Sequence, residues 1–248
     1  MIKTIYANGC SWTVGHGLHE DPALKGILKS QVSEYSWPKT LSTLMGCDHI
    51  NNAEGAGSNE RILRTTIDFV MNYPKDKYDE LLIVIGWSTI ERREAYLEHE
   101  GISGWFRFNA TQPFSSHHAL FSRGLRKEID AHQKNHVALM HNGYADLTAY
   151  FQQVYLLKNL LENLGIKFIF FNSMPWVWGI RPDVEAQFKT HLQETDSPQT
   201  KGMAEQYSFF KYCQETDKPF STCLHPLYDA HNEWAHILRA RIKEVYGE

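Results

Sequence analysis

The sequence predicts an α/β fold with a mostly parallel sheet. Short apolar runs typical of buried strands recur along the chain, and segments with helical periodicity separate them. Strands that alternate with helices form βαβ units, whose crossovers are right-handed and whose strands lie parallel in one sheet. Neither a repeat nor a linker divides the 248 residues. We therefore expect a single domain over residues 1–248.

The first half of the chain supplies three expected strands and two expected helices. The strands cover residues 2–7, 48–53 and 81–86. The third strand, LLIVIG, is apolar throughout, as in a strand that is buried on both faces. Helices are expected over 36–45, where Ser36 is the candidate N-cap, and over 60–73.

The second half contains two expected insertions, at about 92–145 and about 173–225. Neither shows a clear helical or strand period, and insertions of this length inside a domain are more often functional than structureless. The other expected elements are a helix that begins at the N-cap candidate Asp146, a strand over 166–172 and a helix over 233–245.

The composition argues against nucleic acids and membranes as partners. A formal net charge of −4 and a pI near 6.3 provide no basic field, and no stretch reaches the ~18 apolar residues of a membrane span. The four cysteines lie far apart without a C-x-x-C pair, which suits neither a zinc ribbon nor a disulfide scaffold. With no signal-peptide pattern, we expect a cytoplasmic protein that acts on a small molecule.

Small and polar residues follow the expected strands, at the edge where parallel sheets bind ligands. The turn after the first strand reads NGCSWTVGHG, and Ser11 within it could be a nucleophile. Near the other end of the chain, Asp229 precedes His231 by two residues. A turn there could let the acid hold the imidazole Nδ1–H while Nε2 faces the serine.

Four short blocks make the chain resemble an SGNH/GDSL-type hydrolase, as a divergent member of this serine esterase and lipase-like superfamily. In family order the blocks are GCSWT at 9–13, NAEGAGSN at 52–59, GWST at 86–89 and DAH at 229–231. Each block lies beside the expected strand or helix that the family pattern requires. The resemblance extends over nearly the whole chain.

The resemblance implies a flavodoxin-like three-layer α/β/α sandwich that hydrolyses esters with no metal and no organic cofactor. Ser11 would attack the ester, His231 would act as the base, and Asp229 would orient the imidazole. The backbone N–H groups of Ser11 and Gly57, together with the Ser88 hydroxyl, would form the oxyanion hole.

The chain also departs from the family pattern. Cys10 replaces the family's Asp beside the nucleophile, Ser88 replaces an Asn donor with a shorter hydroxyl, and the Asp-x-His spacing is one residue short. A rival interpretation takes His225, which precedes Pro226, as the base, but it places Thr222 where the acid should be. The later histidine is preferred because it comes with an orienting carboxylate.

Several candidates have a second interpretation. Cys10 could itself be the nucleophile, because it lies in the same turn. A metal site is conceivable at the histidines, although no acidic or cysteine spacing supports it. The histidines concerned are His16, His19, His117 and His118.

Two further groups could contact substrate. Arg92 could bind a substrate carboxylate or phosphate, or Arg92 and Arg93 could pair with nearby glutamates on a helix surface. Trp12, Trp87 and Trp176 lie in edge loops, where they could stack on a sugar ring or simply pack in the core.

We therefore predict a serine hydrolase that cleaves a small acyl ester, with an O-acetylated carbohydrate as the leading substrate class. The alternative is a catalytically weak or inactive SGNH-fold binding module that recognises a carbohydrate or another small ligand.

Overall fold

The computed structural model of the chain describes residues 1–99, 102–109, 127–131, 134–135, 142–175, 186, 197–201, 203 and 207–248. Three residues that the sequence marks as candidates lie outside these ranges: His117, His118 and Trp176.

Four parallel strands form the central sheet in the order β2-β1-β3-β6. They are β1 (Thr4–Gly9), β2 (Asp48–Asn51), β3 (Leu81–Trp87) and β6 (Lys167–Asn172). The predicted parallel sheet is thus confirmed, and its strand order begins as flavodoxin-like sheets do. The register aligns Gly9 with Gly86 and Trp87 with Asn172, so the turns that follow β1, β3 and β6 leave the sheet at one edge.

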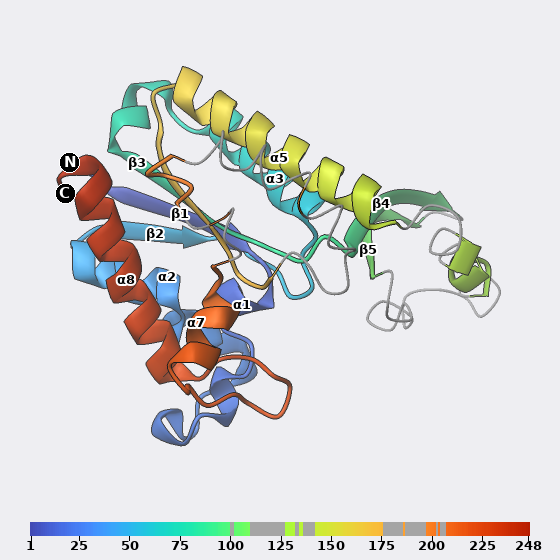
Figure 1. Ribbon diagram of the computed structural model, residues 1–248, viewed down its shortest axis with the longest axis horizontal. Helices are drawn as coiled ribbons and strands as arrows, with labels where there is room; N and C mark the ends of the chain where they lie inside the picture. The colour runs from blue at the N-terminus through green and yellow to red at the C-terminus, as the bar shows by residue number, and fades with distance from the viewer. Residues whose placement is uncertain are drawn as a thin grey trace.

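Helices cover both faces of the sheet and complete three layers (Figure 1). One face carries α3 (Asn59–Asn72) and α5 (Gly143–Asn163), and the other carries α1 (Ser11–Val14), α2 (Trp37–Met45), α7 (Phe209–Glu215) and α8 (Tyr228–Tyr246). Every residue of β3 is buried, because its alternate side chains enter two different cores. Short 3-10 helices lie in the connections at Leu18–Glu20, Pro22–Leu24, Lys29–Tyr35 and Lys75–Glu80.

Helix α5 begins before the expected N-cap. The side chain of Asn142, rather than Asp146, caps the helix by accepting a hydrogen bond from the Ala145 N–H at 2.8 Å. Asp146 instead lies buried inside the first turns, where it pairs with Arg93. The sequence prediction was wrong here because a distant arginine determines the role of this carboxylate.

Helix α8 also begins earlier than expected, at Tyr228 instead of Glu233. The Tyr228 N–H donates to the Asp21 carboxylate at 2.7 Å, so a residue far along the chain stabilises the start of the helix. This early start places both Asp229 and His231 inside the helix.

An antiparallel hairpin of β4 (Arg92–His99) and β5 (Ile102–Asn109) lies within the segment where no period was found. It extends beyond the sheet beside α3 and α5 (Figure 1). Arg64 of α3 binds the Glu94 carboxylate through two hydrogen bonds of 2.8 Å, and Arg93 pairs with Glu60. These charged contacts between β4 and α3 explain why the sequence of β4 lacks the apolar alternation of a strand.

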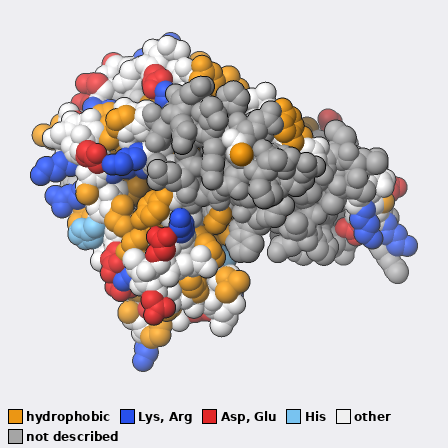
Figure 2. All heavy atoms as spheres, in the orientation of Figure 1, with side chains coloured by type: hydrophobic (Ala, Val, Ile, Leu, Met, Phe, Trp, Pro, Cys, Tyr) orange, Lys and Arg blue, Asp and Glu red, His pale blue; other side chains and the backbone are white. Residues whose placement is uncertain are grey.

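The surface carries charges of both signs. Figure 2 shows Lys and Arg side chains interspersed with Asp and Glu over the coloured part of one face, consistent with the small net charge of −4. Among the described helices, none has the length and apolar character needed to cross a membrane.

Candidate functional site

Ser11, the predicted nucleophile, is the first residue of α1, and a single residue separates it from strand β1. Cys10 is the extended N-cap between them. A Cβ on Gly9 would lie 2.2 Å from the Thr13 hydroxyl and 2.8 Å from the Gly86 carbonyl oxygen, so a side chain at this position would not fit. Ser11 is buried, and as the first helical residue it has no carbonyl one turn earlier to accept its N–H.

Gly57, the second predicted oxyanion donor, lies against the Ser11 turn. A Cβ on Gly57 would come within 2.9 Å of the Gly9 carbonyl oxygen, so glycine permits the close approach of the two loops. The Gly57 N–H, however, donates to the Glu54 carbonyl oxygen at 3.0 Å. The amide that was predicted to stabilise an oxyanion is therefore already bonded within its own turn.

The predicted pair of Asp229 and His231 is not formed. Residues two apart on a helix do not face each other, and here they point to different surroundings. The Asp229 side chain is 72% exposed and lies 3.3 Å from the Lys218 ammonium. His231 is fully buried, and its Nδ1 accepts a hydrogen bond from the Trp37 N–H at 3.2 Å.

This bond fixes the tautomer of His231. Because Nδ1 accepts, the proton of the neutral ring is on Nε2, and within the described residues Nε2 has no partner. A base facing Ser11 would need the opposite tautomer. Burial, with a smaller contribution from the neighbouring His225, lowers the pKa of His231 to about 3. The predicted bond from Ser11 Oγ to His231 Nε2 is thus absent from the described contacts.

His225, the rival base, packs over the Ser11 turn. Its ring centroid lies 5.8 Å from that of His16 and 6.2 Å from that of Trp12, the residue after Ser11. The His16 N–H donates to the Ser11 carbonyl oxygen at 3.0 Å. A Cβ on Gly17 would lie 2.8 Å from the His225 Cβ, which shows how closely this histidine covers the turn.

The Cys223 carbonyl orients the His225 ring. His225 Nδ1 lies 2.9 Å from this carbonyl oxygen, which can only accept, so Nδ1 carries the proton and Nε2 keeps its lone pair. The Cys223 thiol also lies 3.1 Å from Nδ1. Thr222, where the family's acid is expected, instead donates its N–H to the Glu20 carboxylate at 2.7 Å. A backbone carbonyl therefore takes the orienting position of an acid.

The surroundings of His225 keep its ring neutral. Burial lowers the pKa of His225 to about 4, and the nearby charges of His16 and Arg92 act in the same direction. The Cys223 carbonyl and the Glu20 carboxylate oppose this shift. A neutral imidazole with a free Nε2 lone pair can accept a proton from a hydroxyl.

Ser88 occupies the position expected from the third block. It follows β3 two residues after Gly86, as Ser11 follows β1 two residues after Gly9, and the two glycines are paired in register. The Asn59 side chain holds the Ser88 backbone on both sides, accepting its N–H at 2.8 Å and donating to its carbonyl at 3.1 Å. Ser11 and Ser88 therefore leave neighbouring strands at the same level.

The Ser88 hydroxyl is bound by Arg92. Arg92 Nη1 donates to Ser88 Oγ at 2.9 Å, which leaves the hydroxyl proton of Ser88 able to donate elsewhere. Arg92 lies at the start of a strand, so the helix-surface interpretation of Arg92 and Arg93 is wrong.

Two predicted stacking residues are buried in the cores. Trp12 is 2% exposed and meets Phe209 edge-on at 5.4 Å, and Trp87 is 0% exposed and meets Phe170 edge-on at 5.6 Å. Their rings pack against protein and offer no face to a sugar. Cys10 is also fully buried in the core that contains Trp12, so its thiol is not presented to a substrate.

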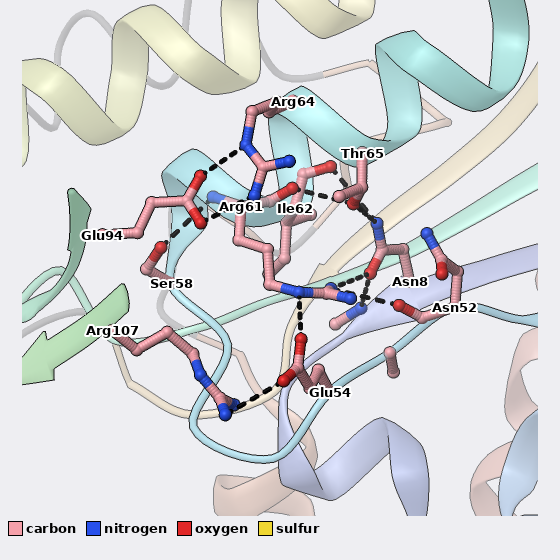
Figure 3. Close-up of polar contacts among 12 residues, drawn as sticks. Asn8, Asn52, Glu54, Ser58, Arg61, Ile62, Arg64, Thr65, Glu94 and Arg107 are labelled. Carbon is pink, nitrogen blue, oxygen red and sulfur yellow. Dashed lines mark hydrogen bonds and ion pairs between the residues drawn. The ribbon is translucent and has the colours of Figure 1, made fainter. Parts of the chain in front are cut away.

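A charged network joins the glycine-rich loop to α3 and to the hairpin (Figure 3). Arg61 Nε donates to Glu54 Oε2 at 2.6 Å, and Arg107 Nη2 lies 2.9 Å from Glu54 Oε1. Arg61 Nη1 also donates to Asn8 Oδ1 at 3.3 Å and to the Asn52 carbonyl at 3.1 Å. The loop that contains Gly57 is thereby fixed to the end of β1 and to β5.

Sequence reasoning did not identify Asn59, Arg61 or Arg107. The arginines gave no local signal, because their partners come from other parts of the chain. Asn59 did offer one, since an amide directly after a glycine-rich turn at the carboxyl edge of a sheet is well placed to bind a neighbouring loop.

The described residues contain no group of three or more His, Cys, Asp or Glu side chains arranged to hold a metal ion. His16 is exposed, and His19 lies 3.8 Å from the Glu20 carboxylate.

Comparisons with known proteins identify a family and a fold. The family described as "Family of unknown function (DUF6071)" matches residues 16–246. A carbohydrate esterase family 2 enzyme with a carbohydrate-binding domain from Corynascus thermopiles (Myceliophthora fergusii) is similar, at 13% identity and a TM-score of 0.53 over 99% of this chain and 67% of that one. A family two carbohydrate esterase from Clostridium thermocellum, solved in complex with cellohexaose, has 12% identity and a TM-score of 0.51 over 99% of this chain and 65% of that one.

A member of the lipolytic protein G-D-S-L family from Veillonella parvula DSM 2008 has 11% identity and a TM-score of 0.45, with 99% of both chains covered. No curated protein matches the sequence. The chain has an SGNH-like α/β fold, similar to that of the two carbohydrate esterases. At such low identity, the likeness concerns the fold alone.

Proposed function

Because the chain belongs to DUF6071, a family of unknown function, and has an SGNH-like fold, we propose that it is a serine hydrolase of small acyl esters, with Ser11 as nucleophile and His225 as base. One observation carries the proposal. The His225 ring packs over the Ser11 turn, and the Cys223 carbonyl holds its Nδ1–H, so Nε2 is free to accept a proton.

The proposed reaction has two steps. In acylation, Ser11 Oγ forms a bond to the ester carbonyl carbon while its proton passes to His225 Nε2, and the ester C–O bond then breaks as the imidazolium protonates the leaving alcohol. In deacylation, water attacks the acyl-serine in the same way and releases the carboxylic acid. Asp229 takes no part, because its carboxylate lies with Lys218.

Two donors are proposed for the oxyanion. The Ser11 N–H is the first, because a helix-start amide has no intrahelical acceptor. The Ser88 hydroxyl is the second, since the hydrogen bond that it accepts from Arg92 leaves its proton available and strengthens it as a donor.

Within this proposal, an O-acetyl or similar ester on a carbohydrate remains the leading substrate class. Its support is the likeness in fold to carbohydrate esterases. Trp12 and Trp87 are buried, so their rings do not support a sugar substrate.

Fluorophosphonate labelling, read by peptide mass spectrometry, tests the nucleophile. We expect labelling at Ser11, turnover of p-nitrophenyl acetate, and loss of both in Ser11→Ala. His225→Ala should lose turnover, whereas His236→Ala, an exposed histidine on α8, serves as the matched control. Absence of labelling at Ser11 in the folded protein would contradict the proposal.

A second candidate function, carbohydrate binding without catalysis, is favoured by one surface feature. Tyr96 and Trp105 of the hairpin are 54% and 47% exposed, and their rings meet edge-on at 5.5 Å. The Arg64 guanidinium lies 4.1 Å above the Trp105 ring and holds it in place. Exposed aromatic rings of this kind can stack on sugars.

Calorimetric titration with cellohexaose tests the second candidate. Binding should be lost in Trp105→Ala and kept in Tyr155→Ala, which removes another exposed aromatic ring, from α5. Identical binding by both variants would argue against the hairpin as a sugar platform.

A further inference from the structure

Arg92 differs from the other described arginines near the carboxyl edge of the sheet. Each of the others has a carboxylate partner: Arg61 and Arg107 share Glu54, Arg64 binds Glu94, and Arg93 pairs with Glu60 and Asp146. Within the part of the chain that the structure describes, the side chain of Arg92 bonds only to the Ser88 hydroxyl, and no carboxylate contacts it.

The position of Arg92 is also unusual for an unpaired charge. Its side chain is half-buried, at the start of β4 and four residues after Ser88. A guanidinium has five N–H donors, of which Ser88 accepts one. Removing a charge from water without a counter-charge costs free energy, so unpaired guanidinium groups at partly buried positions are typical of anion-binding sites.

Arg92 also lies close to the proposed catalytic groups. It contacts Ser88, which leaves β3 at the level of Ser11. Its positive charge also contributes to the lowered pKa of His225. A group bound by the free N–H donors of Arg92 would therefore lie beside the scissile bond of a substrate held at Ser11.

We propose that the substrate of this site is an anionic ester, whose carboxylate or phosphate group is bound by the Arg92 guanidinium. The proposal rests on the proposed function, because it assigns the substrate class of the Ser11 site. A planar guanidinium binds carboxylate and phosphate through two parallel hydrogen bonds, which would fix the ester relative to Ser11. An acetylated carbohydrate substrate would accordingly be one that bears an acidic group.

Turnover of matched esters tests the charge preference. Mono-p-nitrophenyl succinate carries a carboxylate where p-nitrophenyl butyrate carries a methyl group, and m-acetoxybenzoate and m-acetoxybenzamide form the same contrast on the alcohol side. We expect the wild-type protein to prefer the anionic member of at least one pair by about tenfold or more in kcat/KM. Competition by inorganic phosphate and by succinate distinguishes the two kinds of anion.

Variants of Arg92 test whether this residue causes the preference for anionic esters. Arg92→Gln should abolish it mainly by lowering kcat/KM for the anionic ester, and Arg92→Lys should keep part of it as a point charge. Arg239→Gln, on an exposed position of α8, is the control that removes a charge elsewhere. Equal losses on anionic and neutral esters in Arg92→Gln would overturn the proposal and make Arg92 a group that supports the oxyanion. Absence of any charge preference in the wild-type protein would also overturn it.

Binding measurements separate this proposal from the hydrolase proposal. The Ser11→Ala variant, titrated calorimetrically with the same esters, should bind the anionic member more tightly, and the double variant Ser11→Ala/Arg92→Gln should not. If the wild-type protein turns over no ester but this difference in binding is found, the hydrolase proposal fails and the anion site stands. If neither variant distinguishes the charged ester from the neutral one, the anion site fails, whatever the turnover.

Discussion

The backbone N–H of Trp37 donates a hydrogen bond to Nδ1 of His231 across 3.2 Å and so joins the start of α2 to the first turn of α8. Trp37 is the first residue of α2, and the Ser36 N-cap forms no side-chain cap bond. His231 therefore supplies an acceptor that the helix end needs. Phe209 packs edge-on against the same ring at 5.2 Å. These contacts give His231 a structural role.

His231→Ala should lower the free energy of unfolding by about 2–4 kcal/mol, because it leaves a cavity and an unpaired Trp37 N–H. His231→Asn should cost less, since the amide Oδ1 can accept from the same N–H. Urea unfolding followed by circular dichroism measures both. Unchanged stability together with lost esterase turnover would instead identify His231 as the base.

His225→Ala should lower the activity of the protein and leave its stability nearly unchanged. We expect kcat to fall by at least about a thousandfold, because the proton acceptor for Ser11 is removed. The free energy of unfolding should change little, since His225 is half-buried and lies in a loop. Parallel kinetics and urea unfolding on the same preparations provide the measurement, and a large loss of stability without a loss of kcat would contradict the assignment.

The pH dependence of turnover should reflect the lowered pKa of His225. The base is active when neutral, so kcat/KM should stay level down to about pH 5 and fall as the pH drops through about 4. The sequence alone predicts a rise between about pH 6 and 8, around the ordinary pKa near 6.5. Rates measured from acid to neutral pH, with circular dichroism to confirm folding, distinguish the two profiles. An inflection of kcat/KM near pH 6.5 would contradict a lowered pKa of His225.

Stability should fall on acidification because His231 is buried in its neutral form. Its pKa is lowered to about 3 in the folded chain and is near 6.5 when unfolded. Between these values the unfolded chain binds a proton that the folded chain does not, so stability is lost as the pH falls below about 6.5, by up to about 1.4 kcal/mol per pH unit. Urea unfolding at about pH 7 and pH 5 should show a smaller difference for His231→Asn than for the wild-type protein. If the free energy of unfolding changed by the same amount between the two pH values in both proteins, His231 would not contribute to the loss of stability in acid.

Ser88→Ala should lower kcat by about a hundredfold with little change in KM, because the contact of a donor with the oxyanion forms only in the transition state. Ser88→Asn restores the longer amide of the resembled family and should recover activity if the loop has room. Steady-state kinetics on p-nitrophenyl acetate measures both variants. Full activity of Ser88→Ala would mean that the Ser88 hydroxyl only binds the Arg92 side chain and does not donate to the oxyanion.

The sequence alone was sufficient for the parallel sheet and for the turns that leave its carboxyl edge. The run LLIVIG and the turn around Ser11 are local patterns, since a strand buried on both faces must be apolar and a tight exit from β1 requires a glycine at Gly9. Because the carboxyl ends of parallel strands share one edge, the blocks also placed Ser11 and Ser88 at the same edge, where Gly9 and Gly86 are paired. The hairpin was missed because ion pairs, such as that of Arg64 with Glu94, replace apolar alternation.

Only the tertiary structure distinguishes the surroundings of the two histidines. Asp229 and His231 looked like a pair because they are close in sequence, but Asp21 bonds the start of α8 from a distance and draws both into a helix, where residues two apart diverge. His225 lacked a neighbouring acid in the sequence, yet the fold gives it the Cys223 carbonyl as its orienting group. Composition and spacing specify local backbone form, whereas the tautomer of an imidazole depends on which donors and acceptors the folded chain brings to it.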